Sequence, residues 1–234
     1  MARKRKVRSR LTRWSGYLAL AILCVILLTI ALVLPLRWLP PTTSAFMLQD
    51  SSGRVPVAYQ WTNWEQLGNA LPLAVVAAED QKFSQHSGFD IDSIRDSVAD
   101  YNDGDGLRGA STITQQLAKN LYLWPGRNFV RKGVEAWLTV FIEVCLPKKR
   151  ILEIYLNIIE LAPGTYGAAA ASRHFFGKPP AALSDAEAAL LAAVLPNPKR
   201  LNAGRPSQYV RERASWIRMQ MARLRREGWL QSLE

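Results

Sequence analysis

The sequence is poor in metal-binding and redox side chains. Its 234 residues include only two cysteines and two histidines. His86 and His174 lie far apart along the chain and therefore predict no metal cluster. Cys24 and Cys145 lie in segments that we do not expect to meet, so no disulfide is predicted. The chain is long enough to fold around a core without such cross-links, so this scarcity does not argue against an oxidising compartment.

Nucleotide-binding signatures are also missing. The sequence contains no phosphate-cradling glycine loop and no dinucleotide fingerprint. Glycine and aspartate do accumulate in residues 100–109, but their spacing does not fit a calcium-binding loop. We therefore interpret 100–109 as a flexible surface loop. The sequence therefore indicates no nucleotide-binding site.

Positive charge is concentrated at the N-terminus and is followed by a long apolar run. Residues 1–15 carry seven Lys and Arg side chains and no acid, and residues 17–36 carry no charge at all. Twenty helical residues span about 30 Å, the thickness of a bilayer core. A nucleic-acid-binding arm is compatible with the charge alone, but not with its attachment to a membrane span, so we expect no nucleic acid partner. A cleaved signal peptide is the other alternative, but it usually has a shorter apolar region than this one, so a retained membrane span is favoured.

The predicted organisation has four parts. Residues 1–15 form a cytoplasmic basic tail, 16–38 a transmembrane helix, 39–69 a membrane-proximal linker with small strands, and 70–234 the main folded domain. Helical patterns dominate from Leu71 onward, so the fold class is mainly α with minor β content. Near the C-terminus one apolar stripe marks a packing helix with a basic back: Val210, Ala214, Ile217, Met221 and Leu224.

The stretch "AAEDQKFSQHSGFD" (77–90) is the first candidate for chemistry. We expect Glu79 to lie on a helix, on the same face as Val75, Val76, Lys82 and Phe83, with Asp80 pointing elsewhere. Apolar neighbours remove solvent from a carboxylate and raise its pKa toward the range of a general base or acid. A surface glutamate or a structural ion pair is the plainer interpretation.

The stretch "RGASTITQQLAKN" (108–120) predicts a capped helix start. Thr112 followed by Gln115 is the pattern of a capping box. One helical face is polar and carries Thr112, Gln115, Gln116 and Lys119, and another is apolar and carries Ile113, Leu117 and Leu121. A helix N-terminus followed by a lysine is suited to an anion such as phosphate. The polar face carries uncharged hydrogen-bonding groups and one Lys, unlike the mixed charges of an ordinary solvated face, but a plain solvated face is the alternative interpretation.

The stretch "RNFVRKGVEAWLTVFIEVCLPKKRILEIYLN" (127–157) supplies a second carboxylate. Glu135 shares the helical line of Leu138 and Ile142, so it is aimed partly inward and needs a cation or a polar cavity beside it. Arg131 or Lys132 would satisfy it as a structural ion pair. Further along, Glu153 and Asn157 lie one turn apart and are placed to brace the loop "ELAPGTYG".

Two inward carboxylates, a capped helix and clustered cations together describe a transferase that acts on an anionic donor. The runs "EDQKFSQHSGFD", "GASTITQQLAKN", "RKGVE", "KKRILEIYLN" with "YGAAAASRHFFGK", and "ALLAAVLPNPKRLN" occur in this order. With them the chain resembles the monofunctional biosynthetic peptidoglycan glycosyltransferases, which are similar to the glycosyltransferase half of class A penicillin-binding proteins. The resemblance implies a lysozyme-like helical domain with a membrane anchor.

The resemblance also implies roles for particular residues. Glu79 would be the catalytic base that deprotonates the GlcNAc 4-hydroxyl of lipid II, and Glu135 the second carboxylate. Glu135 would be supported by Arg131, Lys132 and Lys148. The oxygen would attack the lipid-linked donor with inversion, forming a β-1,4 bond and releasing undecaprenyl pyrophosphate. The substrate-binding positions implied are Lys119, Arg127, Ser111, Thr112, Gln115, Gln116, Arg131, Lys132, Lys148 and Asn157.

Cofactors, partners and location follow from the same resemblance. Mg²⁺ or Mn²⁺ is used by family members, although no dedicated metal site is visible in this sequence. The expected partners are lipid II, the nascent lipid-linked glycan strand and the bilayer, with cell-wall synthesis or division proteins as further candidates. The expected location is the bacterial inner membrane, single-pass, with a cytoplasmic N-terminus and a periplasmic catalytic domain. No Ser-x-x-Lys or Lys-Thr-Gly motif of a transpeptidase occurs.

Two alternatives remain open at this point. A lysozyme-like lytic enzyme would use a lone glutamate as an acid and would have no use for cations that bind a pyrophosphate. An inactive membrane-tethered scaffold would bind cell-wall proteins without turnover.

Overall fold

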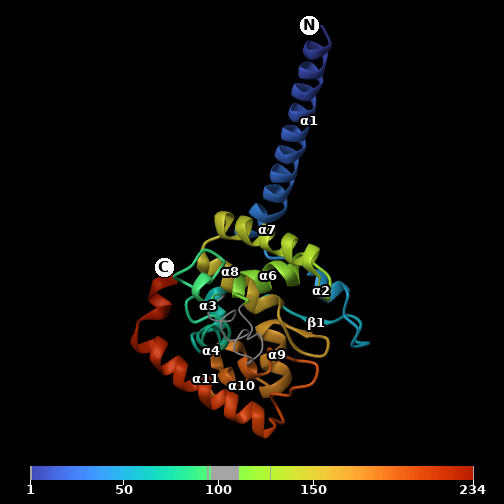
Figure 1. The fold of residues 1–234 in the computed structure, drawn as a ribbon. Helices are drawn as coiled ribbons and strands as arrows, with labels where there is room; N and C mark the ends of the chain where they lie inside the picture. The colour runs from blue at the N-terminus through green and yellow to red at the C-terminus, as the bar shows by residue number, and fades with distance from the viewer. Residues whose placement is uncertain (1, 94, 96–110, 127, 234) are drawn as a thin grey trace, which may run out of the picture.

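One long helix projects from a rounded helical domain in the computed structural model of the chain (Figure 1). The structure describes residues 2–93, 95, 111–126 and 128–233. The loop predicted at 100–109 and the candidate Arg127 lie outside the described residues. Among the described residues the strands are few and short, which confirms the prediction of a mainly α fold with minor β content.

The projecting helix is α1 (Ala2–Val33), followed by a 3₁₀ turn, η1 (Leu34–Arg37). The segment Trp14–Arg37 is long and apolar enough to cross a membrane. Most of its large side chains are exposed, whereas Val33 near its end is buried. The helix begins at Ala2, so the basic tail and the apolar span belong to one continuous element. The prediction of a single N-terminal span is therefore met by one helix of suitable length and composition.

Three helices form the half of the core that carries Glu79: α4 (Ala70–Glu79), α10 (Asp185–Ala193) and α11 (Gln208–Arg226). Each of them packs against the other two. The apolar residues of α4 are buried from Leu71 to Ala77, and the alanines of α10 allow the close approach. The predicted stripe of α11 is confirmed, since Val210, Ala214, Ile217, Met221 and Leu224 are all buried.

The other half of the core is built on α6 (Ile113–Tyr122), which packs against both α7 (Phe129–Cys145) and α8 (Lys148–Ile158). Ile113, Leu117 and Leu121 of α6 are buried, as the period of the sequence predicts. On the membrane side α7 contacts α1, and the Trp137 indole donates a hydrogen bond to Thr29 Oγ1 at 3.1 Å. Arg37 Nη1 also donates to the Cys145 carbonyl at 3.1 Å. These contacts tie the domain to its N-terminal helix.

The strands form one small sheet. Its order is β1 (Ala58–Tyr59), β3 (Thr165–Tyr166), β2 (Glu160–Ala162), with β1 parallel and β2 antiparallel to the central β3. Strand β1 comes from the predicted linker, so the small strand expected there is present. The remaining elements are short helices and turns around the core: α2 (Ala45–Leu48), α3 (Trp64–Leu67), α9 (Gly167–Phe176), η2 (Pro180–Ala182) and η3 (Trp229–Leu233).

Asn157 is a structural residue, which corrects its prediction as a substrate-binding residue. Its side chain is fully buried. Its Oδ1 accepts from the Thr62 amide at 2.7 Å, and its Nδ2 donates to the carbonyls of Thr62 at 2.9 Å and Glu153 at 2.8 Å. Glu153 Oε1 accepts from the Trp64 amide at 2.7 Å. The pair therefore holds the segment 62–64 against α8, and not the loop "ELAPGTYG", because this side of α8 faces the linker.

We predict that Asn157→Ala lowers the free energy of unfolding by about 2–4 kcal/mol, because it leaves the buried amide and carbonyl of Thr62 without partners. Denaturant unfolding of the full chain measures the change. The control is Asn69→Ala, since Asn69 is exposed and its side chain makes no capping bond at the start of α4. Equal stabilities of the two variants would contradict the structural role.

Candidate active site

Glu79 is the last residue of α4, and the chain leaves the helix at Asp80. The prediction that Lys82 and Phe83 share the helical face of Glu79 is therefore wrong. Asp80 adopts φ −163° and ψ 75°, and its carboxylate is buried. Phe83 is buried in the core, while Lys82 Nζ lies 3.9 Å from Asp90 and 3.7 Å from Asp92.

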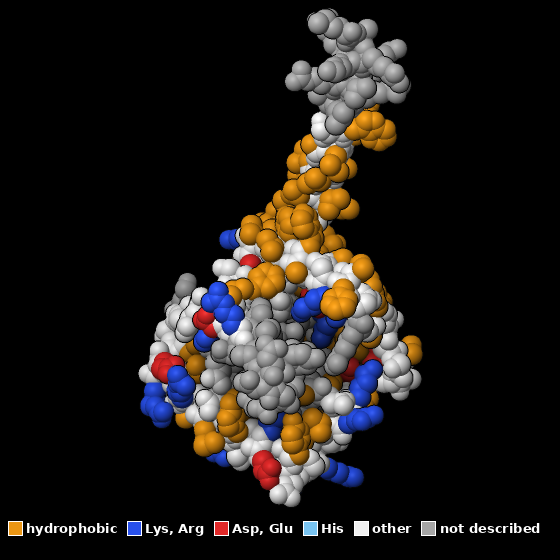
Figure 2. All heavy atoms as spheres, in the orientation of Figure 1, with side chains coloured by type: hydrophobic (Ala, Val, Ile, Leu, Met, Phe, Trp, Pro, Cys, Tyr) orange, Lys and Arg blue, Asp and Glu red, His pale blue; other side chains and the backbone are white. Residues whose placement is uncertain are grey.

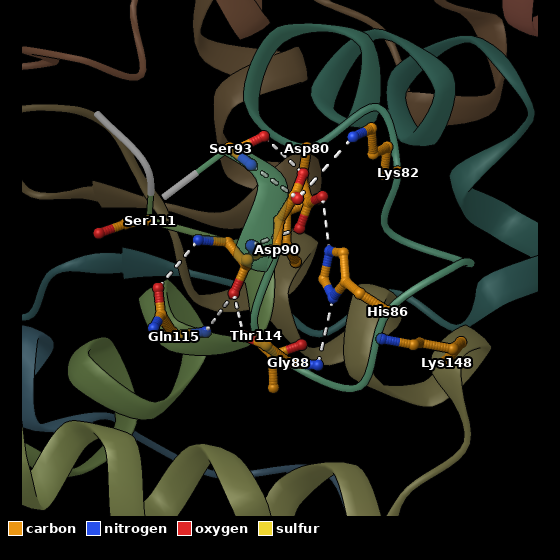
Figure 3. A network of polar contacts seen from close by, with 12 residues as sticks. Asp80, Lys82, His86, Gly88, Asp90, Ser93, Ser111, Thr114, Gln115 and Lys148 are labelled. Atoms are coloured by element: carbon orange, nitrogen blue, oxygen red, sulfur yellow. Dashed lines mark hydrogen bonds and ion pairs between the residues drawn. The ribbon is translucent and has the colours of Figure 1, made fainter. Parts of the chain in front are cut away.

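The carboxylate of Asp80 joins the segment after α4 to the start of α6 (Figure 3). Asp80 Oδ2 accepts from the Ile113 amide at 3.0 Å, in the first turn of α6. Its Oδ1 is 2.9 Å from His86 Nε2, and His86 Nδ1 accepts from the Gly88 amide at 3.2 Å. Because Nδ1 is an acceptor here, Nε2 carries the proton that is shared with Asp80. Sequence reasoning did not anticipate this role for Asp80.

The N-terminus of α6 has the capping box that the sequence predicts. Thr112 Oγ1 accepts from the Gln115 amide at 3.3 Å, and Gln115 Oε1 accepts from the Thr112 amide at 3.1 Å. Thr112 Oγ1 also donates to the Gly88 carbonyl at 2.7 Å. The side chain of Gln115 is buried and its carbonyl oxygen is used in the cap, so it shapes the helix start.

A hollow of about 310 Å³ opens in front of Glu79. The side chains that matter most to its chemistry come from the end of α4, from the segment that follows, from the start of α6 and from α11: Glu79, Lys82, Asp90, Ser111, Thr112 and Trp216. Ser111 and Thr112 thus lie where the sequence predicts, facing the same space as the candidate base.

Glu79 is largely buried, and its two carboxylate oxygens have different partners. Its side chain is 15% exposed. Gln116 Nε2 donates to Oε2 at 2.9 Å, and Arg213 Nη2 lies 3.6 Å from Oε1. Burial raises the pKa of the Glu79 carboxyl above its usual range, and the Gln116 hydrogen bond and the charges of Arg213 and Lys119 offset only part of that rise. The predicted desolvation of Glu79 is confirmed.

Tyr155 fixes the orientation of Gln116. Its hydroxyl donates to Gln116 Oε1 at 2.7 Å, from a ring that is almost completely buried on α8. Burial raises the pKa of Tyr155 well above its usual range, so the hydroxyl stays protonated and acts as a donor. Since Oε1 of Gln116 is occupied, its amino group is the end that points at Glu79.

A second hollow, of about 200 Å³, lies on the other side of Gln116. It is lined by residues of α2, α6, α8 and β2, including Phe46, Gln116, Lys119, Asn120, Tyr155 and Glu160. Lys119 Nζ lies 5.6 Å from the centre of the Phe46 ring. Burial lowers the pKa of the Lys119 ammonium, and the nearby carboxylate of Glu135 opposes that effect. Gln116 therefore lines this hollow while its amino group binds Glu79, and so it joins the candidate base to the candidate anion site.

Glu135 is buried on α7 and paired with two cations. Its carboxylate accepts from Arg131 Nη1 at 2.9 Å and forms a short contact with Lys132 Nζ. The inward direction expected for Glu135 is confirmed, and so is the ion pair with Arg131 and Lys132. Arg131 Nε is buried and has no hydrogen-bond partner among the described residues.

Lys148 does not support Glu135 in this structure, which corrects that expectation. Lys148 Nζ pairs with Glu143 at 2.8 Å and lies 4.5 Å from the centre of the Phe83 ring. Glu143 is on α7, two turns beyond Glu135, and also accepts a hydrogen bond from Thr114 Oγ1 at 2.5 Å. Lys148 starts α8, so this pair joins the starts of α6 and α8 to α7.

Arg213 is a neighbour of the base that sequence reasoning missed. It sits three residues after Val210 and four before Ile217, both of which are buried in the stripe of α11. This spacing places Arg213 at the edge of the packing face, and it is the signal in the sequence by which Arg213 could have been found. The stripe alone does not reveal that this edge faces Glu79.

Among the described residues no three His, Cys, Asp or Glu side chains gather into a group that would hold a metal ion. The carboxylates of Glu79 and Glu135 are each partnered by protein donors. These residues do not fit a metal site held by the protein, and the use of Mg²⁺ or Mn²⁺ stays a prediction.

Comparison with known proteins assigns the family. The model of the transglycosylase family matches residues 50–222. A biosynthetic peptidoglycan transglycosylase of Stutzerimonas stutzeri (strain A1501) is 48% identical over 219 residues, covering 91% of this chain and 90% of that protein. The one of Shewanella frigidimarina (strain NCIMB 400) is 53% identical over 188 residues, covering 80% and 82%. The chain therefore belongs to the transglycosylase family, whose domain is lysozyme-like and helical.

We predict that Glu79→Gln makes the folded domain more stable than the native chain at pH 7, and that this advantage shrinks as the pH falls. The native pKa of Glu79 is raised, so the unfolded chain releases this proton first, and ionising the buried carboxyl costs stability as the pH rises. A neutral amide removes that cost. Thermal unfolding between pH 5 and pH 8 measures the difference.

The control is Glu65→Gln, because Glu65 is exposed on α3. If the two variants show the same pH dependence of stability, Glu79 is not desolvated.

Proposed function

We propose that this chain polymerises peptidoglycan glycan strands from lipid II. Glu79 removes the proton from the 4-hydroxyl of the acceptor GlcNAc, and that oxygen attacks the anomeric carbon of the lipid-linked donor. The donor carbon inverts, a β-1,4 bond forms, and undecaprenyl pyrophosphate leaves. The observation that carries the proposal is the position of Gln116, which binds Glu79 on one side and lines the Lys119 hollow on the other.

The environment of Glu79 suits a general base. A carboxylate whose pKa is raised by burial accepts a proton more readily than an exposed one. The Gln116 amino group holds one carboxylate oxygen at 2.9 Å, which leaves the other side of the group to a substrate hydroxyl. Ser111 and Thr112 add hydroxyl groups to the same hollow.

The cations suit a pyrophosphate leaving group. Negative charge grows on the departing oxygen as the glycosidic bond breaks, and fixed cations stabilise it most in a site that excludes water. Lys119 is poorly solvated, and Glu135 holds Arg131 and Lys132 near it. We assign Lys119 to phosphate oxygens, with the charge of Arg131 close behind it. Arg127 stays a prediction for the same role.

The membrane topology is part of the proposal. The basic tail precedes the apolar span, and cytoplasmic flanks of spans carry an excess of Lys and Arg. We infer a single pass through the inner membrane, a cytoplasmic N-terminus and a periplasmic catalytic domain, with cell-wall synthesis or division proteins as partners. Lipid II presents its sugars on that side, within reach of a domain fixed to α1 by α7.

Two substrates separate this proposal from its rival. Purified protein incubated with lipid II gives glycan polymer, whereas a lytic enzyme incubated with finished peptidoglycan releases small muropeptides. Release of muropeptides from finished peptidoglycan, with no polymer from lipid II, would overturn the proposal.

Running the lipid II reaction with a chelator tests the metal, because activity that survives complete chelation removes Mg²⁺ and Mn²⁺ from the mechanism.

We predict that Glu79→Gln lowers the rate of lipid II polymerisation by about 10²–10⁴-fold, the usual contribution of a general base. Lipid II binding stays close to that of the native chain, since Gln is isosteric with Glu. The measurement pairs a polymerisation assay with a binding assay, and Glu65→Gln is the matched control. Normal turnover by Glu79→Gln would refute the assigned base.

We predict that Arg213→Gln moves the acid limb of the pH–rate profile to higher pH. The guanidinium lies 3.6 Å from Glu79 and lowers the pKa of that carboxyl, so its removal raises the pKa and leaves less of the base ionised at a given pH. The control Arg211→Gln removes the same charge from an exposed position of α11. An identical acid limb in both variants would separate Arg213 from the base.

A further inference from the structure

Lys119 is assigned to phosphate oxygens, yet no carboxylate or carbonyl holds its ammonium in place. Among the residues that the structure describes, Lys119 Nζ forms no ion pair and no hydrogen bond. The carboxylate of Glu135, which acts on the pKa of Lys119, is paired with Arg131 and Lys132. A lysine ammonium sits on a flexible four-carbon stem, so a contact of another kind is needed to fix its position.

That contact is the aromatic ring of Phe46 on α2. Lys119 Nζ lies over this ring, 5.6 Å from its centre. The face of an aromatic ring attracts a cation, and the attraction is stronger where water is excluded. The ring carries no net charge, so, unlike a carboxylate, it holds the ammonium without neutralising it. The positive charge of Lys119 therefore stays available to an anion.

Phe46 and Lys119 line the same hollow of about 200 Å³ beside Gln116. The ring of Phe46 is partly buried and packs against the core. Figure 2 shows Lys and Arg side chains lying next to hydrophobic ones in the half of the domain nearer to α1. The ammonium held by the ring thus faces the space that we assign to the diphosphate of the donor.

Helix α2 is short, but hydrogen bonds fix it at both ends. At its start, Ser44 Oγ accepts from the Met47 amide at 3.2 Å, and the Met47 side chain is buried in the core. At its end, Gln49 Nε2 donates to the carbonyl of Leu123 at 3.3 Å, directly after α6. The helix that carries Phe46 is therefore attached to the helix that carries Lys119.

Tyr166 of β3 attaches α2 to the sheet as well. Its hydroxyl donates to Asp50 Oδ2 at 2.8 Å and lies 3.3 Å from the carbonyl oxygen of Phe46. The backbone of Phe46 is thus held from a second side. A ring on a fixed backbone can define the position of a flexible cation.

We propose that Phe46 is a positioning residue of the anion site, whose ring directs the Lys119 ammonium toward the diphosphate of the lipid-linked donor. The inference rests on the proposed function and adds to it a residue of the membrane-proximal linker. Phe46 acts through Lys119 and takes no part in bond formation itself.

The test places phenylalanine analogues with one, two and three fluorine atoms on the ring at position 46 of the full chain. Fluorine withdraws electrons from the ring face and weakens its attraction for a cation, while the shape of the side chain is nearly kept. Calorimetry measures the affinity for inorganic pyrophosphate, and a polymerisation assay measures kcat/KM for lipid II. The variant Lys119→Gln defines the part of the pyrophosphate binding that belongs to this site, because the basic tail also attracts anions.

We expect the site-specific pyrophosphate affinity and kcat/KM to fall with each added fluorine. The loss reaches about tenfold with three fluorines, or about 1.4 kcal/mol. Phe46→Leu keeps an apolar side chain without a ring and loses about as much. Phe46→Tyr keeps the ring and is expected to restore native affinity and rate.

The matched control is Phe176→Leu. Phe176 is also partly buried against the core, at the end of α9, and among the described residues no Lys or Arg lies over its ring. This variant is expected to bind pyrophosphate and to polymerise lipid II as the native chain does. Thermal unfolding checks that all variants are folded.

Equal affinities and rates across the fluorinated series would overturn the proposal and leave Phe46 as a packing residue. The proposal also fails if the native chain binds pyrophosphate no better than Lys119→Gln does. A stepwise loss of pyrophosphate affinity in a chain that does not polymerise lipid II would support the contact between Phe46 and Lys119 and refute the proposed function instead.

Discussion

The site depends on one buried carboxylate that takes no direct part in the proposed chemistry. Asp80 accepts the first-turn amide of Ile113 and pairs with His86, and it does so at the point where the chain leaves α4. These bonds fix the end of α4 against the start of α6. As a result Glu79 faces Gln116, which lies on the first turn of the neighbouring helix, and both groups are held by helices whose cores are fully packed.

The two buried carboxylates of the site, Glu79 and Glu135, differ in how closely cations approach them. Glu79 is desolvated and has one weak ionic contact, whereas Glu135 is enclosed by two cations. A buried carboxylate with few cationic partners keeps a raised pKa, whereas one that is paired with two cations holds them in place. In the proposed function, two chemically identical side chains therefore serve as a base and as an organiser of positive charge.

Much of this arrangement can be predicted from the sequence. The capping box at Thr112, the stripe of α11 and the inward Glu135 depend on local spacing, and each appears as predicted. The predictions that fail depend on where a helix ends or on which helices meet. Lys82 leaves the face of Glu79 because Asp80 breaks the helix, and Lys148 turns to Glu143 because α8 begins beside α7. Arg213 reaches Glu79 from a helix more than a hundred residues away, a contact that no local pattern encodes.

The junction between α1 and α7 sets the geometry in which any reaction takes place. A hydrogen bond from Trp137 to Thr29 and another from Arg37 to the Cys145 carbonyl attach the domain directly to the spanning helix, without a free tether. With α1 upright in a bilayer, the hollow at Glu79 works at a constant height above the lipid headgroups. Substrates then need to search only two dimensions, and a lengthening product has to slide sideways across the enzyme rather than lift it away from the surface.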